Sequence, residues 1–400
     1  MPTRRPPSVS IAAALALLVA TAIWLPLLHL LCQPPLTQFR QADAIAPRAR
    51  ELAARHLQLW ENSDQRAAEI ARMRQANAEW DFMGRTFLVL ALANMALREP
   101  AQQPRYLGVI DTIIDETLRL ETEHGMTFFL MGYAQARPFV AQPGRSTFVD
   151  GEIALMLAAR QLVAREPRYD PLLAWRVDIA LQYLAQGPAL NGESYPDECW
   201  MFCNSLAIAA AKLSDRVDGR DHSRFIERWL AVIKQRLVDP QTGLLVSSFK
   251  YDGSPLDGPE GSSIWLAAHM LQLVDPEFAA DQYQRARQQL GQSVLGFGYA
   301  TEWPATWSGP ADVDSGPIVP IVGASAGSSG LAVLGAAAFD DAAFLQRLLT
   351  TLQFAAFPIR SAGQLRYAAS NQVGDAVLLY ALVQGPLWER ARSSRDRGQP

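Results

Sequence analysis

Residues 148–186 read FVDGEIALMLAARQLVAREPRYDPLLAWRVDIALQYLAQ, and this stretch sets the pattern of the whole chain. Apolar residues recur three and four positions apart on both sides of Arg165-Glu-Pro, which is the period of amphipathic helices. The proline stops the first helix, and the polar turn around it lets the second helix return beside the first. The stretch therefore predicts an antiparallel pair of helices.

The same pattern continues from about residue 41 to the C-terminus. Breakers such as Asp239-Pro and Asp275-Pro separate further pairs, and β-like patterns are confined to short pieces at 126–131, 244–250 and 364–368. Since no low-complexity linker divides the chain, we expect a single domain of paired helices. The helices are expected near residues 41–60, 62–77, 80–98, 103–122, 148–165, 168–186, 199–213, 221–237, 262–274, 276–292, 322–338, 341–356 and 373–391.

The number of paired helices indicates an all-α fold. About twelve or thirteen helices, joined in places by long loops with aromatic and acidic residues, favour an (α/α)6 toroid. In that shape a nearly uncharged inner ring of helices is surrounded by an outer ring, and loops at one end form the site. An irregular α-solenoid with a similar number of helices stays open as the alternative.

The N-terminus carries an apolar segment, SVSIAAALALLVATAIWLPLLHLLC at 8–32, without Asp, Glu, Lys or Arg. About 20 apolar residues suffice to cross a bilayer. A cleaved signal peptide is the weaker alternative, because no small-x-small site ends the segment. A lipoprotein modified at Cys32 is disfavoured by the leucines before it. We therefore expect one retained transmembrane anchor at 9–32.

Basic residues give this anchor a direction. Arg4 and Arg5 precede it, whereas no Lys or Arg follows it before Arg40. The positive-inside rule therefore predicts a cytoplasmic tail at 1–8 and an extracytoplasmic, periplasmic domain at 33–400, held by a single pass in the inner membrane.

Composition narrows the classes of function. Hydrophobic residues make up 49% and charged residues 19% of the chain, as in an ordinary globular domain. The net charge is −4 and basic residues do not cluster, so nucleic acid is not expected as a partner. No HExxH or GxGxxG motif indicates zinc or dinucleotide chemistry. We expect a small-molecule substrate, no metal and no cofactor, and a homo-oligomer is left open.

The richest candidate segment is ESYPDECWMFCNS at 193–205. Its proline ends any preceding helix, and Asp197 is a candidate cap for the next one, which places Trp200 and Cys203 on the first turns. A helix N-terminus favours anions and lowers the pKa of a thiol, so these residues suit a site. A capped core helix with buried thiols at Cys199 and Cys203 is the competing interpretation.

Carboxylates open two further helices. Asp150 and Glu152 begin an apolar helix, where they could serve as general acid and base at the mouth of a cavity. Capping by Asp150, with Glu152 favourable to the helix dipole, explains both residues equally well. Asp81 opens another helix, where capping is favoured over an inward orientation.

Two loops carry the remaining candidates. Glycines on both sides of Glu260 let the backbone turn tightly before Ser262, although a solvated β-turn is the alternative. The long loop GYATEWPATWSGPADVDSG holds Trp303 and Trp307, whose rings suit sugars or terpenoid hydrocarbon. The same loop holds the carboxylates Glu302, Asp312 and Asp314. The pair Asp312 and Asp314 could hold a hard cation, but the sequence offers no identifiable third ligand to complete a metal site.

Several of these residues belong to a recognisable pattern. Pro196-Asp197 followed by Cys203-Asn204-Ser205, and then LVDPQTG at 237–243 and VDPEF at 274–278, resemble the linalool dehydratase/isomerase family. The similarity covers about residues 80–340 and is strongest over 190–280. It implies an (α/α)6 fold and cofactor-independent acid/base dehydration or isomerisation of monoterpene alcohols.

The resemblance carries over only partly to the site. The second cysteine of the family falls on Cys203, whereas its first cysteine falls on Ser194. Its histidine falls on Glu152, and its tyrosine falls near Ser262. These departures imply that the barrel is kept but that linalool is not the substrate.

Three hypotheses follow. The first is an extracytoplasmic lyase or isomerase that exchanges protons with a hydroxylated, terpenoid or sugar-like substrate. The second is a hydrolase or lyase that acts on glycans through paired carboxylates, and the third is a membrane-tethered binding module without catalysis. The candidate catalytic residues are Glu152, Asp150, Cys203, Glu260 and Asp314, and the candidate substrate-binding residues are Asp81, Ser194, Asp197, Trp200, Ser262, Trp303, Trp307 and Asp312.

Overall fold

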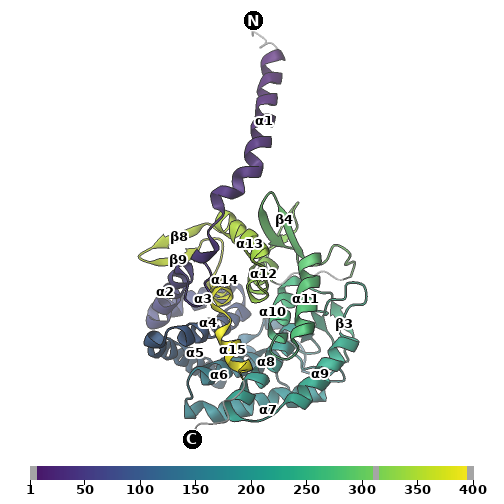
Figure 1. Cartoon of the computed structure of the whole chain (residues 1–400). Helices are drawn as coiled ribbons and strands as arrows, with labels where there is room; N and C mark the ends of the chain where they lie inside the picture. Colours follow the sequence, from purple (N-terminus) through teal and green to yellow (C-terminus); the bar gives the residue numbers. More distant parts are fainter. Residues whose placement is uncertain (1–6, 310–314, 394–400) are drawn as a thin grey trace.

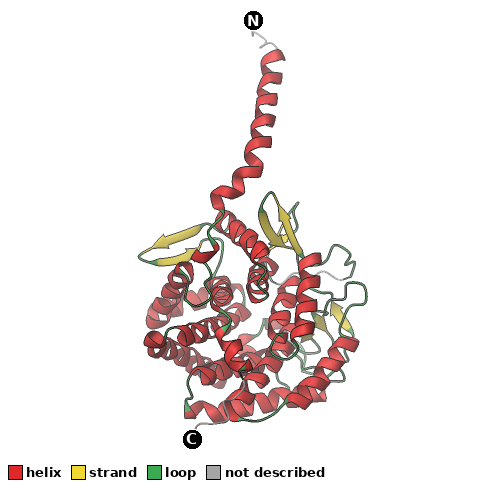
Figure 2. Ribbon diagram, in the orientation of Figure 1, coloured by secondary structure: helices red, strands yellow, loops and turns green. Residues whose placement is uncertain are grey.

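The structure, a computed structural model, describes residues 7–309 and 315–393. It is mostly helical, with short hairpins and one small three-stranded sheet, as Figures 1 and 2 show. The prediction of a predominantly helical chain is confirmed. The α-helices are α1 (Pro7–Cys32), α2 (Pro47–Glu61), α3 (Ser63–Ala76), α4 (Ala78–Arg98), α5 (Gln103–His124), α6 (Thr147–Val163), α7 (Asp170–Gln186), α8 (Met201–Asp218), α9 (Ser223–Arg236), α10 (Gly261–Leu271), α11 (Pro276–Gln289), α12 (Ala326–Ala338), α13 (Ala342–Ala355), α14 (Gln372–Val383) and α15 (Pro386–Arg392). The strands are β1 (Cys199–Trp200), β2 (Ser248–Phe249), β3 (Pro255–Asp257), β4 (Gly291–Val294), β5 (Phe297–Ala300), β6 (Ile318–Val319), β7 (Ala324–Ser325), β8 (Pro358–Ser361) and β9 (Gln364–Tyr367).

Six helices of the described chain contact one another in a cyclic order. Helix α4 contacts α6, α6 contacts α8, and the series continues through α10, α12 and α14 back to α4. We call these the cyclic helices. They are rich in buried residues, and α6 is buried along its whole length. Helices α5, α7, α11 and α13 each contact the cyclic helix that precedes them, so each of these predicted pairs consists of one buried helix and one more exposed partner.

Polar side chains fix where several cyclic helices begin. The side chain of Asn77 accepts the N–H of Glu79 at 2.8 Å at the start of α4, and Ser146 accepts the N–H of Val149 at the start of α6. Ser325 caps α12 and Asn371 caps α14 in the same way. Asn and Ser are preferred caps because their oxygens satisfy N–H groups that have no partner inside the helix.

Helix α15 packs against the cyclic helices near their C-terminal ends. It contacts α4, α6 and α8. The indole of Trp388 stacks on the imidazole of His269 near the end of α10, with ring centroids 4.9 Å apart. The backbone N–H of Leu387 donates to the Asn94 amide oxygen at 3.0 Å, which satisfies a buried donor at the start of α15.

Helix α1 extends away from the body of the molecule in Figure 1. Within the described residues it is the one helix long and apolar enough to cross a membrane, and none of its apolar window is buried. Its length and composition fit a membrane anchor or a signal sequence. Near its end, the ring of His29 lies over Gly296 and meets Phe297 edge to face at 6.4 Å, so the helix contacts the hairpin β4–β5.

Some predicted boundaries are wrong. Residues 373–391 form two helices, because Gly385 has a φ of 129° and Pro386 follows it. The piece 126–131 begins with a 3-10 helix rather than a strand. The end of the segment 276–292 turns into the strand β4, which pairs with β5. Short hairpins of this kind carry too little periodicity to separate them from the end of a helix.

The predicted caps are also wrong. The segment before α8 forms β1, so Cys199 and Trp200 precede the helix, and Asp197 has a φ of 53° and does not cap it. Asp81 lies in the first turn of α4, after its cap, and Asp150 lies in the first turn of α6, after its cap. Both caps were overlooked because Asn77 and Ser146 stand just before the apolar pattern begins.

Candidate active site

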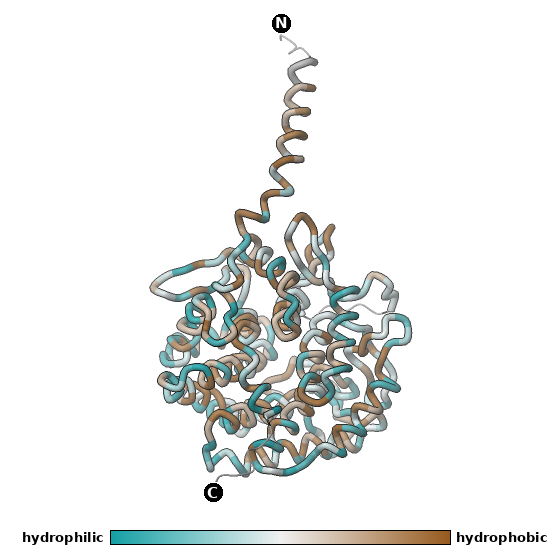
Figure 3. Tube along the Cα trace, viewed as in Figure 1, coloured by the Kyte–Doolittle hydropathy of each residue, from teal (hydrophilic) through white to brown (hydrophobic). Residues whose placement is uncertain are grey.

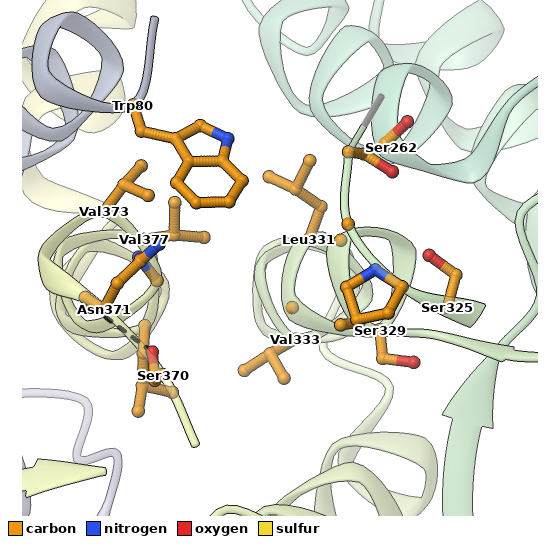
Figure 4. A pocket seen from close by; sticks show the side chains of 18 of the residues that line it. Trp80, Ser262, Ser325, Ser329, Leu331, Val333, Ser370, Asn371, Val373 and Val377 are labelled. Carbon is orange, nitrogen blue, oxygen red and sulfur yellow. Dashed lines mark hydrogen bonds between the residues drawn. The ribbon is translucent and has the colours of Figure 1, made fainter. Parts of the chain in front are cut away.

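A cavity of about 770 Å³ lies at the N-terminal ends of the cyclic helices. Each of these helices contributes a residue from its first turns to the lining, and hairpin β6–β7 and helix α13 complete the wall. Figure 4 shows Asn371 and Val373 of α14 on one side and Leu331 and Ser329 of α12 on the other. Cavities of this size accommodate small organic molecules.

The lining is largely apolar and holds no Lys, Arg or His among the described residues. Aliphatic side chains and serines predominate, and the indoles of Trp80 and Trp200 add aromatic faces. Among the described residues, the acidic members of the lining are Glu79 and Asp375. A phosphate or carboxylate ligand would find no cationic partner on this wall, so the lining favours a neutral molecule.

Glu79 and Tyr195 form a polar part of the cavity lining. The Tyr195 hydroxyl donates a short hydrogen bond to Oε1 of Glu79 and accepts the N–H of Met131 at 3.0 Å. Burial, reinforced by the Glu79 charge, raises the pKa of Tyr195. Both Glu79 and Tyr195 line the cavity, so a carboxyl and a phenol are presented together to a ligand.

Trp200 of β1 also lines the cavity. Its indole N–H donates to Oε1 of Glu198 at 2.6 Å, and the Tyr133 hydroxyl donates to the same carboxylate at 3.2 Å. Burial raises the pKa of Glu198. These contacts hold the ring of Trp200 in the cavity wall.

The thiol of Cys203 lies in the lining at the start of α8. Burial raises its pKa well above the usual value, and a hydrogen bond with Ser194 opposes this shift. The charges that Glu152 and Glu79 carry when ionised would act in the same direction as burial. The thiol is therefore held in the neutral form, contrary to the expectation that a helix N-terminus would lower its pKa.

Glu152 lies one helical turn beyond Phe148, which lines the cavity. Thr86 of α4 donates to its Oε2 at 2.5 Å, and its other oxygen has no hydrogen-bond partner in the structure. Burial raises the pKa of Glu152 to about 8, the hydrogen bond from Thr86 opposes the shift, and the Glu79 charge adds to it. Glu152 is thus a protonated acid at neutral pH, placed behind the cavity wall.

Asp375 approaches the cavity from the first turn of α14. Burial raises its pKa to about 7, and Ser370 and Arg55 oppose that shift. Its Oδ1 is buried without a hydrogen-bond partner in the structure. A carboxyl in this state exchanges protons near neutral pH, which is what an acid or base in catalysis requires.

A group of serines forms the wall around the start of α10 and α12. Glu302 lies behind it, where its carboxylate accepts hydrogen bonds from the backbone N–H of Ser262 at 2.9 Å and from the hydroxyls of Ser315 and Ser325. Gly261 lets the start of α10 pack closely against Ser328 of α12, because a Cβ there would collide with Ser328. Glu302 therefore serves to orient the serine hydroxyls and backbone at the cavity wall.

The structure brings together only part of the predicted site. Cys203, Trp200 and Ser262 line the cavity, and Ser194 and Glu152 lie directly behind it. The buried Glu260 precedes α10 outside the lining. Trp303 and Trp307 also lie outside the lining, with the ring of Trp307 against Gly258. The predicted residues Asp312 and Asp314 lie outside the described residues.

Three predicted carboxylates are engaged elsewhere. Asp150 forms ion pairs with Arg145 and Arg176. Asp81 pairs with Arg85 at 2.9 Å, and Asp197 accepts the N–H of Tyr251 at 3.2 Å. None of them belongs to the cavity lining, so we leave them out of the candidate site.

Sequence reasoning missed Glu79, Tyr195 and Asp375. Glu79 and Asp375 follow the capping residues Asn77 and Asn371, where an acidic residue is ordinary because it suits the helix dipole. Tyr195 lay within the segment that we singled out but was passed over. The position of Glu79 and Asp375, two and four residues after a cap at the start of an apolar helix, is the signal that could have found these two carboxyls.

Carboxyls with raised pKa values lie at or behind the wall of an apolar cavity, an arrangement that marks a candidate functional site. Residues 195–373 match the model of the linalool dehydratase/isomerase family, which is named for an enzyme activity. The resemblance inferred from the sequence is confirmed. The matched region includes Cys203 and Ser262, whereas Glu79 and Glu152 precede it and Asp375 follows it.

Proposed function

We propose that this protein is a membrane-anchored, extracytoplasmic lyase or isomerase that uses acid/base chemistry, without a cofactor, on an apolar hydroxylated molecule other than linalool. The cyclic helices would form the (α/α)6 toroid that carries the site. The cyclic contacts and the family match support this fold. The apolar, unburied helix α1 supports the anchor, and the arginines before it support the orientation.

One observation carries the proposed reaction: an apolar cavity presents the acids Glu79 and Asp375 without a cation in its described lining. Loss of water from an alcohol needs a proton donor at the hydroxyl and a base at the neighbouring carbon. Positive charge that develops on carbon is stabilised by nearby carboxylates and by aromatic faces such as those of Trp80 and Trp200.

We assign the proton donor to Asp375 and the base to Glu79. As the C–O bond breaks, Asp375 delivers a proton to the departing oxygen, which leaves as water. Glu79 removes a proton from the adjacent carbon, and the C–H electron pair becomes the double bond. If the C–O bond instead breaks to leave a cation, water can return to another of its carbons, and the extra proton of that water passes back to the Asp375 carboxylate to give an isomer. Glu152 acts as a positioning residue, because it lies behind the wall rather than in it.

The proposal is tested with the full chain in detergent and a panel of tertiary and allylic alcohols, with alkene and isomer measured by gas chromatography. We expect turnover that falls about 10²-fold or more in Glu79→Gln and in Asp375→Asn, as for loss of a general acid or base. Glu227→Gln, on the exposed side of α9, is the control and should leave turnover unchanged. Equal turnover in all variants would remove the acid/base assignment.

The other two hypotheses predict different outcomes of the same assay. A glycan-acting enzyme is favoured by the pair of carboxyls in the lining and would release sugar from oligosaccharides instead of alkene from alcohols. A binding module would retain a ligand in the cavity without converting it. The mostly apolar lining favours the alcohol over the glycan.

A further inference from the structure

Large apolar side chains are exposed on three turns near the base of α1. The tip of hairpin β4–β5 carries Val294 and Leu295, and the turn of hairpin β6–β7 carries Val319, Ile321 and Val322. Phe357 lies between α13 and β8. Ile321 is fully exposed and Phe357 is 63% exposed. We call these six residues the apolar collar.

The collar lies at the same end of the body as α1. In Figure 1 the hairpin at β4 and the strand β8 flank the base of α1, and Figure 3 shows hydrophobic colour on loops at this end. Helix α13 contacts both α1 and β5, and β5 contacts β7. The elements that carry the collar are therefore linked by contacts to the base of α1.

Aromatic contacts fix the level of the collar along α1. The ring of His29 lies over Gly296, between the two strands of the first hairpin, and meets Phe297. Phe297 in turn packs against Phe354 of α13, with ring centroids 5.0 Å apart. His29 is three residues before the end of α1 at Cys32, so the tip of β4–β5 lies beside the last turn of the apolar helix.

The length of α1 places this last turn at a membrane surface. Its 26 residues extend for about 39 Å, whereas the hydrocarbon core is about 30 Å thick. The remaining length lies in the interfacial layers, where apolar and aromatic side chains are favourable. A turn that contacts His29 is then at the depth of the lipid head groups.

The backbone conformation at the collar also indicates that its apolar residues contact an apolar phase. Leu295, Ile321 and Phe357 have φ values of 48°, 75° and 51°. This left-handed region favours Gly, Asn and Asp, and it is costly for bulky and β-branched residues. A polar turn residue would relieve the backbone and suit water better, so large apolar residues at all three tips point to contact with an apolar phase.

We propose that the apolar collar rests in the interfacial layer of the same bilayer that α1 spans, so that the domain lies directly on the membrane. The inference depends on the anchoring in the proposed function. Lipid is favoured over a second copy of the chain, because the exposed side chains stand on separate turn tips around the helix rather than on one flat face.

The test uses the full chain with Cys32→Ser, in which Cys199 and Cys203 are buried. Single cysteines at Leu295→Cys and Ile321→Cys are labelled with the environment-sensitive dye NBD, in nanodiscs that hold one chain each. Leu172→Cys is the matched control, since Leu172 is an exposed leucine on α7, at the opposite end of the body in Figure 1. Phosphatidylcholine with a doxyl group at carbon 5 of one acyl chain serves as the quencher.

We expect blue-shifted emission and at least twofold quenching at Leu295→Cys and Ile321→Cys, and neither at Leu172→Cys. Emission at both sites at a wavelength as long as that of the control would refute the collar. A blue shift without quenching that grows when two chains share a disc would overturn it in favour of a second copy. Flotation with liposomes separates the failures: a chain that floats but is not quenched refutes the collar alone, whereas a chain that does not float refutes the anchor and the collar together.

Discussion

The hydroxyl of Thr86 on α4 donates a 2.5 Å hydrogen bond to Glu152 on α6, and it is the one hydrogen bond of this buried carboxyl within the described residues. Burial exceeds the effect of this bond and raises the pKa of Glu152 to about 8. A buried acid that is neutral at pH 7 links the stability of the protein to pH.

Glu152→Gln should flatten the pH dependence of stability. The pKa of Glu152 is about 8 in the folded protein, against an ordinary value of 4.5, so the unfolded chain releases this proton first. Stability contributed by the neutral acid is complete below pH 4.5 and is lost as the pH rises to about 8. Removing the titration should reduce the slope by about 1.4 kcal/mol per pH unit. Denaturant unfolding of the full chain in detergent at pH 5 to 8 measures this slope, and an unchanged slope would show that Glu152 is ionised in the folded state.

Asp375→Asn should remove an alkaline limb of the pH–rate profile. The neutral form of Asp375 donates the proton in the proposed reaction, and its pKa is about 7, so activity should fall as the pH rises through this value. The residual activity of Asp375→Asn should lack that fall, while KM changes little. Initial rates from pH 5 to 9 check this, and Glu227→Gln should keep the wild-type profile. An alkaline limb retained in Asp375→Asn would assign the acid to another group.

The thiols of Cys199 and Cys203 should resist alkylation in the folded chain. Burial raises the pKa of both, so almost no thiolate is present at pH 8. Iodoacetamide with peptide mass spectrometry should find both unmodified in native protein and fully modified in guanidinium chloride. Arg224→Cys, at an exposed position in the first turn of α9, supplies an accessible thiol as the control. Rapid native modification of Cys203 would contradict the neutral, enclosed thiol.

Arg176→Met should destabilise the fold without changing the pH–rate profile. Asp150 is 2% exposed and pairs with Arg176 and Arg145, so losing one partner leaves a buried charge partly uncompensated. Removing a partner from a buried ion pair costs about 3–5 kcal/mol. Equilibrium unfolding measures the loss, and Arg165→Met, in an exposed pair with Asp170, should change the stability little. A shifted pH–rate profile in Arg176→Met would return Asp150 to the catalytic site.

Trp388→Ala should cost about 3–5 kcal/mol of stability, as for other buried aromatic truncations. Its indole stacks on His269 and donates to a backbone carbonyl, and it lies where α15 covers the cyclic helices. Leu172→Ala, on an exposed face of α7, should cost little. Thermal unfolding of the full chain compares the two, and similar losses would mean that α15 contributes little to the fold.

The helices were predictable from the sequence because the buried side of each helix requires apolar residues three and four positions apart. The predicted segment 148–165 corresponds to α6 at Thr147–Val163, and 103–122 corresponds to α5 at Gln103–His124. The hairpins β4–β5 and β8–β9 were missed in part because strands of four residues carry little periodicity. Gly385 and Pro386 split the last predicted helix, and that break was readable from the sequence.

The site was less predictable, because spacing alone does not tell which side of a helix faces inward. Asp150 and Glu152 are two residues apart, so they project to different sides of α6. Glu152 meets Thr86 behind the cavity, whereas Asp150 meets the arginines. The choice depends on which neighbouring helices supply apolar surface and which supply Arg, and those neighbours come from distant parts of the chain.

Val319 belongs both to the exposed hairpin β6–β7 and to the cavity lining. With the collar in lipid, the exposed part of the cavity wall at Val319 would face the bilayer rather than bulk water. A lipophilic alcohol would then reach the cavity by two-dimensional diffusion, and turnover would follow its mole fraction among the phospholipids. Surface dilution kinetics would result: extra vesicle lipid at a fixed total amount of substrate would slow the reaction.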